Sequence, residues 1–280
     1  MFCDYHVHTH FSDDSLYLME NVIKDAVAMQ MKEICFTDHV DYGIKWDQEN
    51  LTQAVIDQLS IGHEFPPLNV NYAEYFKEIA RLRLKYPEIV IKQGMEFGMQ
   101  MHTIDQFQKL FNRYAFDFII LSCHQVEDKE FWTQDFQRGR TQKEYHDRYY
   151  QEILDVIQNY KDYSVLGHLD LIARYDQAGS YPFENIKDIV TKILQTVIRD
   201  GKGIEVNTSS HRYGLKDLTP SRDILKLYQS LGGKIITIGS DSHQKEHLGA
   251  YIEETKKELK ALGFSHYCTF ERMQPIFHQL

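Results

Sequence analysis

Two histidines near the start of the chain have the spacing of metal ligands. His6 and His8 are two positions apart, so an extended segment presents both imidazoles on one face. Two imidazoles held side by side can bind one cation, and Asp4 and Asp14 are close enough in sequence to add carboxylate oxygens or to orient the rings. An isolated His-x-His also fits an edge strand with two solvated histidines, so the rest of the chain must decide.

The segments that would position these histidines alternate regularly in type. Short apolar runs suited to strands are each followed by a stretch with helical spacing of apolar residues, and seven such units can be counted. The expected strands lie within the first ten residues and at 32–37, 89–95, 116–122, 163–166, 203–207 and 234–239. This alternation predicts a parallel α/β sheet, and the number of units without a glycine-rich dinucleotide loop favours a TIM-like barrel.

Two polar stretches interrupt the alternation. They lie at about 40–71 and 125–141, and we interpret them as loops inserted into a single domain of residues 1–280. A short helix is expected at 51–59 in the first insert, and Ser15 is expected to cap a helix that reaches about residue 31. The residues after 262 are interpreted as a short tail. The aromatic residues of the inserts that could wall a substrate pocket are Tyr42, Trp46, Phe131 and Trp132.

Histidines and carboxylates gather where the expected strands end. They are His6, His8, His39, Glu96, His124, His168, Asp241 and His243. Barrel enzymes hold their active sites at the C-terminal ends of the strands, and clustered groups of this kind need pairing or a cation to offset their desolvation. Imidazole and carboxylate donors without a thiolate favour zinc, manganese or iron, in a site able to hold more than one ion. Asp13 competes with Asp14, because adjacent residues of an extended segment face opposite ways.

Composition excludes several classes of function. The formal net charge of −10 argues against nucleic acid as the main partner, although it leaves room for a small phosphate-bearing substrate at a cation site. No apolar run approaches the roughly 18 residues of a membrane helix, and the start of the chain lacks the pattern of a signal peptide. The four cysteines form no CxxC pair and are interpreted as reduced thiols. We therefore expect a cytoplasmic protein without a membrane partner.

The order of these motifs resembles the polymerase and histidinol phosphatase (PHP) metallohydrolases over essentially the full length. The matching segments are His6-Val7-His8, Thr37-Asp38-His39, Gly94-Met95-Glu96, His124, Gly167-His168 and Ser240-Asp241-Ser242-His243. The resemblance implies a distorted (β/α)7 barrel with three divalent ions per chain. It assigns one ion to His6, His8, Glu96 and Asp241, a second to Asp14, His39 and His243, and a third to His124 and His168, with Glu96 bridging two of them. Many members carry a histidine where Asp14 stands.

Two further segments are similar to the histidinol-phosphate phosphatase branch of the family. They are 167–174, which ends in Arg174, and 205–212, which ends in Arg212. Both arginines follow expected strands on the metal side, where a guanidinium could grip phosphate oxygens. The alternative is that each arginine pairs with a nearby carboxylate such as Asp170 or Asp217.

The main hypothesis is hydrolysis of L-histidinol phosphate, a step of histidine biosynthesis, by a hydroxide that bridges the metal ions. No side chain is assigned as a catalytic acid or base, and the proton donor to the leaving group stays open. One alternative keeps the metals but uses another small phosphomonoester, a nucleotide or a phosphodiester. Another is a metal-binding or regulatory module without activity, although a structural site would not need so many donors. The oligomeric state is not predicted.

Overall fold

The fold is taken from a computed structural model, which describes residues 1–51 and 67–280. The helix expected at 51–59 therefore lies almost entirely outside the described residues. The barrel strands are β1 (Cys3–Val7), β2 (Glu33–Phe36), β4 (Val90–Gly98), β5 (Phe118–Ser122), β8 (Val165–Leu166), β9 (Gly203–Asn207) and β10 (Ile236–Gly239). The α-helices between and after them are α1 (Met19–Ala28), α3 (Tyr72–Lys85), α4 (Ile104–Arg113), α5 (Gln142–Asn159), α6 (Phe183–Arg199), α7 (Arg222–Ser230) and α8 (Ile252–Ala261).

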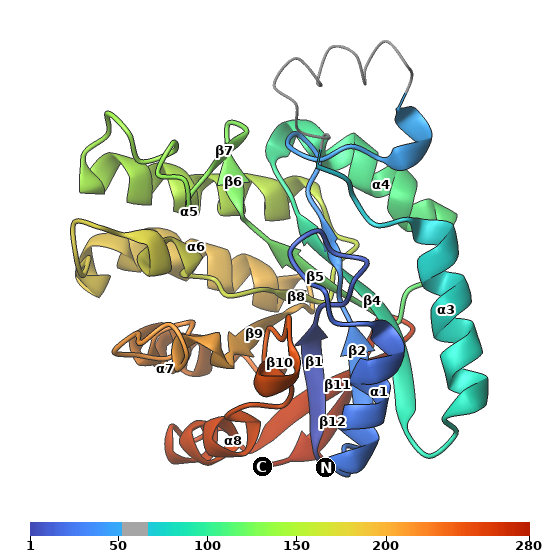
Figure 1. The fold of residues 1–280 in the computed structure, drawn as a ribbon. Helices are drawn as coiled ribbons and strands as arrows, with labels where there is room; N and C mark the ends of the chain where they lie inside the picture. Colours follow the sequence, from blue (N-terminus) through green and yellow to red (C-terminus); the bar gives the residue numbers. More distant parts are fainter. Residues whose placement is uncertain (52–66) are drawn as a thin grey trace.

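These strands form a nearly closed parallel barrel. Their order is β1-β2-β4-β5-β8-β9-β10, and the short strand β3 (His39–Val40) adds to β4. Between the first and last strands the ring is joined by one bridge, Val7 to Ser242, with the His8 amide donating to the Ser242 carbonyl at 2.8 Å. The helices lie around the outside of the sheet (Figure 1). The predicted distorted (β/α)7 barrel is confirmed.

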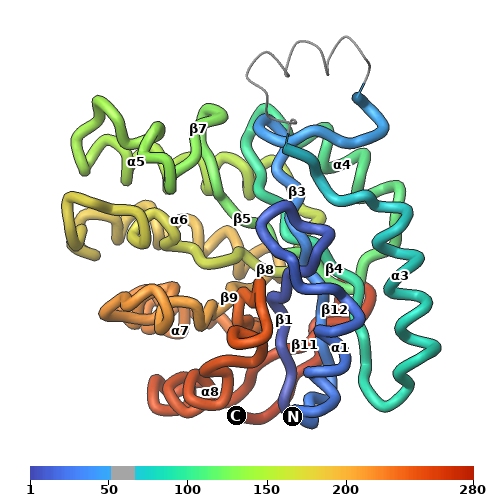
Figure 2. Tube along the Cα trace, in the orientation of Figure 1, coloured from blue at the N-terminus to red at the C-terminus, as the bar shows by residue number. Residues whose placement is uncertain are grey.

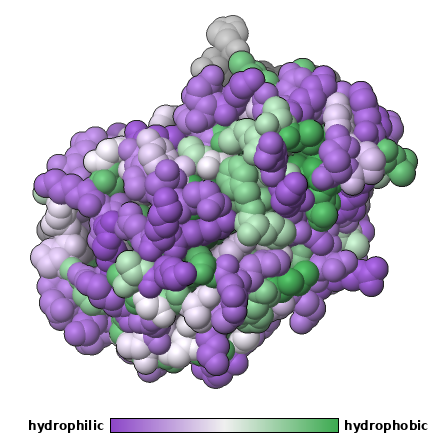
Figure 3. All heavy atoms as spheres, turned by 90° about the horizontal axis from the view of Figure 1, so that it is seen from below, coloured by the Kyte–Doolittle hydropathy of each residue, from purple (hydrophilic) through white to green (hydrophobic). Residues whose placement is uncertain are grey.

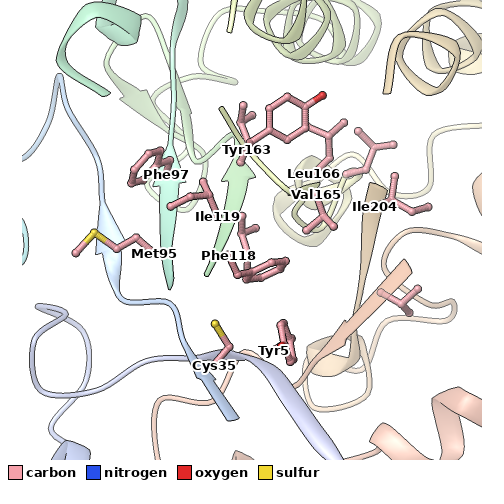
Figure 4. Close-up of a cluster of buried hydrophobic side chains, with 14 of the residues drawn as sticks. Tyr5, Cys35, Met95, Phe97, Phe118, Ile119, Tyr163, Val165, Leu166 and Ile204 are labelled. Atoms are coloured by element: carbon pink, nitrogen blue, oxygen red, sulfur yellow. The ribbon is translucent and has the colours of Figure 1, made fainter. Parts of the chain in front are cut away.

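Local sequence explains where the helices begin and which face they bury. Thr141 and Glu144 form a capping box at the start of α5, and Asn71 accepts a hydrogen bond from the Glu74 amide at the start of α3. Each helix turns a stripe of apolar side chains toward the sheet. Figure 4 shows buried apolar side chains of several barrel strands, among them Tyr5 on β1 and Phe118 on β5, whose rings lie close together. This packing fixes the strand ends that carry the polar residues.

The first strand contains an irregularity that matters for the site. Its pairing with β2 shifts register between Asp4 and Val7. The Tyr5 ring lies 5.0 Å from that of Phe118 on β5, and His6 Nε2 lies 3.1 Å from the carboxylate of Glu96 on β4. Two consecutive side chains thus contact strands that are not neighbours of β1, which a regular alternating strand does not do. A local bulge of this kind is a usual way to re-aim a side chain.

The C-terminal segment is a hairpin, so its interpretation as a tail was wrong. β11 (His266–Glu271) and β12 (Gln274–Gln279) pair antiparallel, and Met273 donates from its amide to the carbonyl of Asp117, just before β5. Phe270 packs on Phe118, and the hydroxyl of Tyr5 bonds to the Phe270 carbonyl. The hairpin therefore covers the N-terminal end of the barrel, away from the strand ends of interest. Figure 2 shows the two chain termini close to each other beside it.

The first helix also differs from expectation. α1 begins at Met19, and its N-cap residue, Leu18, makes no capping hydrogen bond with its side chain. Ser15 instead donates its hydroxyl hydrogen to the carbonyl of His243 at 2.9 Å, and Leu16 is 95% exposed. Residues 12–18 thus form a loop at the mouth of the barrel, because Ser15 bonds across the seam instead of to the helix. This loop places Asp14 near the other polar residues.

The inserts contain short elements. The first has β3 and the 3-10 helix η1 (Gln48–Asn50), and the second has the hairpin β6 (Gln125–Val126) and β7 (Lys129–Glu130). No helix among the described residues is long and apolar enough to cross a membrane. Hydrophilic side chains cover most of the face in Figure 3, and hydrophobic ones gather there in a limited band. The apolar side chains are thus mainly inside the barrel and under its helices.

Candidate metal centre

Every predicted ligand lies at the C-terminal end of the barrel. His6 lies on β1 and His8 directly after it, Glu96 lies near the end of β4, His39 lies on β3, and the others lie in the segments that follow their strands. His6, His8 and Glu96 are fully buried. β3 places His39 directly beside Glu96 in the sheet. The structure therefore brings together groups that are far apart in sequence, as the strand-end pattern predicted.

Glu96 stands at the centre of the cluster. Its Oε1 lies 3.1 Å from His124 Nε2 and 2.9 Å from His168 Nε2. Its Oε2 lies 3.1 Å from His6 Nε2, 3.5 Å from His8 Nε2 and 3.0 Å from His39 Nδ1. The two carboxylate oxygens thus face two different sets of imidazoles. This is the arrangement required of a carboxylate that bridges two ions.

Asp241 and Asp14 complete two of the three sets. Asp241 Oδ1 lies 3.4 Å from His8 Nε2 and 3.7 Å from His6 Nε2. Asp14 Oδ2 lies 3.5 Å from His39 Nε2 and 3.0 Å from His243 Nε2. Asp13 instead pairs with Lys45 at 2.7 Å, so the geometry favours Asp14 over Asp13 as a ligand.

These contacts suit divalent cations. Ligand atoms bound about 2.0–2.1 Å from one tetrahedral zinc are about 3.4 Å apart, close to the distances between the facing nitrogens and oxygens here. Three donor atoms approach within 4.8 Å of one another in four overlapping groups, among them His6 with His8 and Asp241, and His39 with Glu96 and His124. His8 Nε2 and His39 Nδ1 are buried, and although carboxylate oxygens lie 3.0–3.5 Å away, neither forms a hydrogen bond of acceptable geometry among the described residues. A cation would satisfy them.

Without cations the site is strongly polarised. Burial alone would lower the pKa of His6, but Glu205, Glu96 and Asp241 outweigh it and hold that pKa well above its usual value. Burial alone would raise the pKa of Glu96, but His6, His124 and His39 outweigh it and hold that pKa well below its usual value. His8 differs, because burial and the neighbouring imidazoles His39 and His243 lower its pKa. The low pKa keeps His8 in its neutral form, which is the form that binds a metal ion.

Carboxylates that were not predicted orient two of the imidazoles. Glu205, on β9, lies 2.5 Å from His6 Nδ1 through Oε1 and accepts the His168 amide at 2.9 Å through Oε2. Asp41 lies 2.7 Å from His124 Nδ1. Each holds the ring nitrogen that faces away from the centre, which fixes the direction of Nε2. Glu205 could have been suspected from its place near the end of a strand, whereas Asp41 carried no such signal.

A lysine and a glycine hold Asp41 in place. Lys45 Nζ lies 3.0 Å from Asp41 Oδ2 and is only 10% exposed. A Cβ at position 98 would come within 1.8 Å of Asp41 Oδ1 and 2.7 Å of His124 Nδ1. Gly98 therefore leaves the room in which Asp41 meets His124.

A cavity of about 170 Å³ opens above the cluster. The predicted phosphate-binding Arg174 lines it, and Tyr213 lies between the two predicted arginines, 4.3 Å from the Arg174 guanidinium and 5.4 Å from that of Arg212. Both guanidinium groups lie 3.6 Å from Asp241 Oδ2. The alternative partners are engaged elsewhere: Asp217 pairs with Arg222, and Asp170 accepts the Ser221 amide.

Only one of the four insert aromatics lines this cavity. Trp132 does, and it is 64% exposed. Tyr42 is buried and donates its hydroxyl hydrogen to Asp47, and Phe131 is buried against Phe136. The backbone of Trp46 forms an isolated β-bridge with that of Leu68. The other aromatic side chains of the cavity, Tyr175 and Tyr213, follow β8 and β9 and were not predicted.

Comparison with known proteins agrees with this geometry. The family model described as "PHP domain" matches residues 4–209. The chain belongs to the PHP domain family. A histidinol-phosphatase of Lactococcus lactis is 32% identical over 97% of this chain and 95% of its own length. A probable histidinol-phosphatase of Thermotoga maritima is 27% identical over 94% of this chain and 93% of its own length.

Two solved structures superpose over most of the chain. The Lactococcus lactis histidinol phosphate phosphatase, solved with zinc, L-histidinol and phosphate, has a TM-score of 0.84 at 31% identity and covers 98% of both chains. A putative histidinol phosphatase of Listeria monocytogenes has a TM-score of 0.70 at 19% identity, covering 89% of this chain and 98% of its own, which supports the fold alone.

Proposed function

We propose that this protein is a metal-dependent phosphomonoesterase that hydrolyses L-histidinol phosphate to L-histidinol and phosphate. The observation that carries the proposal is the buried carboxylate of Glu96, whose two oxygens face separate sets of imidazoles below a cavity lined by arginine. The histidinol-phosphatase names of full-length relatives supply the substrate. Histidine biosynthesis follows as the process, and the four buried, unpaired cysteines fit a reducing, cytoplasmic setting.

The proposed ligands divide into three sets, for three ions of zinc, manganese or iron. The sets are His6, His8, Glu96 and Asp241; Asp14, His39 and His243; and His124 and His168 with the other oxygen of Glu96. Divalent ions held there would polarise a phosphoryl oxygen and lower the pKa of water. We further propose that residues 1–280 form one domain, because the hairpin β11–β12 packs on the barrel that carries the site.

The side chains of the cavity would bind and orient the phosphate. Arg174 is 8% exposed and uses one terminal nitrogen to donate to Ser209 Oγ at 2.5 Å, while its Nε has no partner among the described residues. A buried guanidinium with unused N–H groups binds a phosphate oxygen well. The stacked Tyr213 ring limits the directions that it can take.

Phosphate release from L-histidinol phosphate tests the proposal. Purified protein loaded with zinc or manganese should release phosphate from this monoester much faster than it cleaves bis-p-nitrophenyl phosphate. His8→Ala should reduce kcat/KM by more than about 100-fold, since it removes a ligand. Arg174→Ala should raise KM by about 10- to 100-fold, since it removes charged hydrogen bonds.

Two outcomes would count against the proposal. Faster cleavage of the diester would favour the phosphodiesterase alternative. A fully metal-loaded protein that releases no phosphate from L-histidinol phosphate would refute the substrate. The control is His266→Ala, on the hairpin at the other end of the barrel, which should leave the rate unchanged.

A further inference from the structure

One of the proposed ligands has an unusual backbone conformation. Among the predicted metal ligands, all of which the structure describes, Asp241 alone has a positive φ, of 56°. A side chain is disfavoured in this left-handed region, so the surrounding structure must hold it there. The conformation matters, because it places Asp241 Oδ1 within 3.4 Å of His8 Nε2 and Oδ2 beside the arginines.

One side of the segment is held by the first strand. The Ser240 amide donates to Asp4 Oδ1 at 2.9 Å, and its hydroxyl donates to Asp4 Oδ2 at 2.5 Å. The Ser242 amide donates to the His6 carbonyl at 3.2 Å. These bonds fix the amides on either side of Asp241. They leave the carbonyls of Ser240 and Asp241 to be satisfied from elsewhere.

Arg212 satisfies both carbonyls. Its Nη1 donates to the Ser240 carbonyl at 2.6 Å and its Nη2 to the Asp241 carbonyl at 2.5 Å. The Asp241 carbonyl also contacts His243 Nδ1 at 2.9 Å, which directs His243 Nε2 toward Asp14. The guanidinium therefore spans the two peptide groups that flank the Asp241 Cα atom. It also touches the carbonyl that orients a second proposed ligand.

We propose that Arg212 is a positioning residue that clamps Asp241 in its left-handed conformation and, through the shared carbonyl, orients His243. Its planar fork suits two successive carbonyls, which a single ammonium group cannot reproduce. The two predicted phosphate arginines then differ in role: Arg174 keeps free N–H groups for the phosphate, whereas Arg212 acts first on the metal centre. The inference rests on the proposed function only in taking Asp241 and His243 as ligands.

Zinc binding without substrate separates these roles. Zinc affinity would be measured for the full chain in chelator-buffered solutions, with bound metal counted by mass spectrometry. Arg212→Lys should weaken zinc binding about 10- to 100-fold, the usual effect of losing a group that orients a ligand. Arg174→Lys, the matched control, should bind zinc like the wild type and show weaker binding of inorganic phosphate.

A second variant separates a lost clamp from a lost fold. Arg212→Ala should regain zinc affinity when guanidinium chloride is added at millimolar concentration, and methylammonium should not restore it. Wild-type zinc affinity in Arg212→Lys, or rescue of Arg212→Ala by both cations, would overturn the clamp. A zinc-loaded wild type without activity on L-histidinol phosphate, but with the expected loss in Arg212→Lys, would refute the proposed substrate and leave the clamp standing.

Discussion

The direction of three imidazoles in this centre is set by a second polar group. Glu205 holds His6, Asp41 holds His124, and the Asp241 carbonyl holds His243. Each contact engages the nitrogen that faces away from the proposed ion. A ring that could rotate would lose conformational freedom on binding a cation, so these contacts raise the affinity in advance. The residues behind the ligands therefore decide how tightly the centre binds metal.

Glu205→Gln is the sharpest single test of that view. Glu205 accepts from three donors: His6 Nδ1–H through Oε1, and the His168 amide and the Asn207 side-chain amide through Oε2. Glutamine has the same shape but one acceptor oxygen, so at least one buried donor would be left unsatisfied. We expect zinc affinity, measured by competition with a chelating dye, to fall about 10- to 100-fold.

The control for this substitution is Glu253→Gln on α8. That glutamate is 56% exposed and pairs only with Lys256 among the described residues. The zinc affinity of the Glu253→Gln variant should match that of the wild type. Equal affinities for Glu205→Gln and the wild type would show that His6 needs no orienting carboxylate.

At the level of elements, the hairpin β11–β12 closes the end of the barrel that lacks the metal centre. Phe270 is 2% exposed, and its ring lies 5.0 Å from that of Phe118. The hairpin is therefore part of the core, although its sequence follows the last barrel unit. Changes in it should affect stability and leave the site unchanged.

Phe270→Ala tests this separation. Removing a buried phenyl ring costs about 3–5 kcal/mol of unfolding free energy, from lost burial and the cavity left behind. Urea unfolding should show that loss, while kcat and KM of the folded protein stay at wild-type values. Phe277→Ala on the same hairpin, where the ring is 49% exposed, should change stability by no more than about 0.5 kcal/mol. A loss of activity in folded Phe270→Ala would contradict the separation.

The sequence was sufficient for the barrel and for the residues that approach one another in the centre. Buried positions in strands and helices recur at fixed spacing, so apolar residues in the sequence indicate both kinds of element. Parallel strands then bring their C-terminal ends together. The loop at 12–18 was misjudged because Ser15 bonds to a residue 228 positions away instead of to its own helix. The hairpin was missed because its partners, such as Tyr5, are 265 positions distant.

The orienting groups were harder to predict for the same reason. Asp41 lies only two positions after His39, yet the ring that it holds belongs to His124, 83 positions away. The contact of Glu205 with His6 could be predicted only once β9 is known to lie next to β10, which meets β1 across the seam. Pairwise contacts of this kind depend on which strands become neighbours, and a single sequence carries no periodic signal for them.

For the molecule as a whole, metal removal should reverse the effect of pH on stability. In the metal-free centre burial alone would lower the pKa of His124, but Glu96 and Asp41 raise it from 6.5 to about 9. A raised folded-state pKa means that this ionic stabilisation is complete below about pH 6.5 and is lost as the pH rises through about 9. The loss is of order 3 kcal/mol at most.

Zinc should produce the opposite slope, because it binds neutral imidazole and releases protons. We expect the Tm in EDTA to fall between pH 6.5 and 9, and the increase in Tm caused by zinc to grow over the same interval. Thermal unfolding at three pH values with and without zinc measures both. Parallel curves would show that these histidines do not exchange protons for metal.

The seam between β1 and β10 gives the centre a role in assembly as well as in chemistry. A single bridge joins the ends of these strands, and the strands with the residues just after them carry His6, His8, Asp241 and His243. Asp4 and Ser240, which meet across the seam, are 236 positions apart. An ion held by both sides would act as a cross-link that closes a loop of that length. By lowering the entropy of the unfolded chain, it would stabilise the folded state by about 5 kcal/mol. A ribosome must release nearly the whole polypeptide before such a link can form, so cation uptake would be among the last events in the maturation of each molecule.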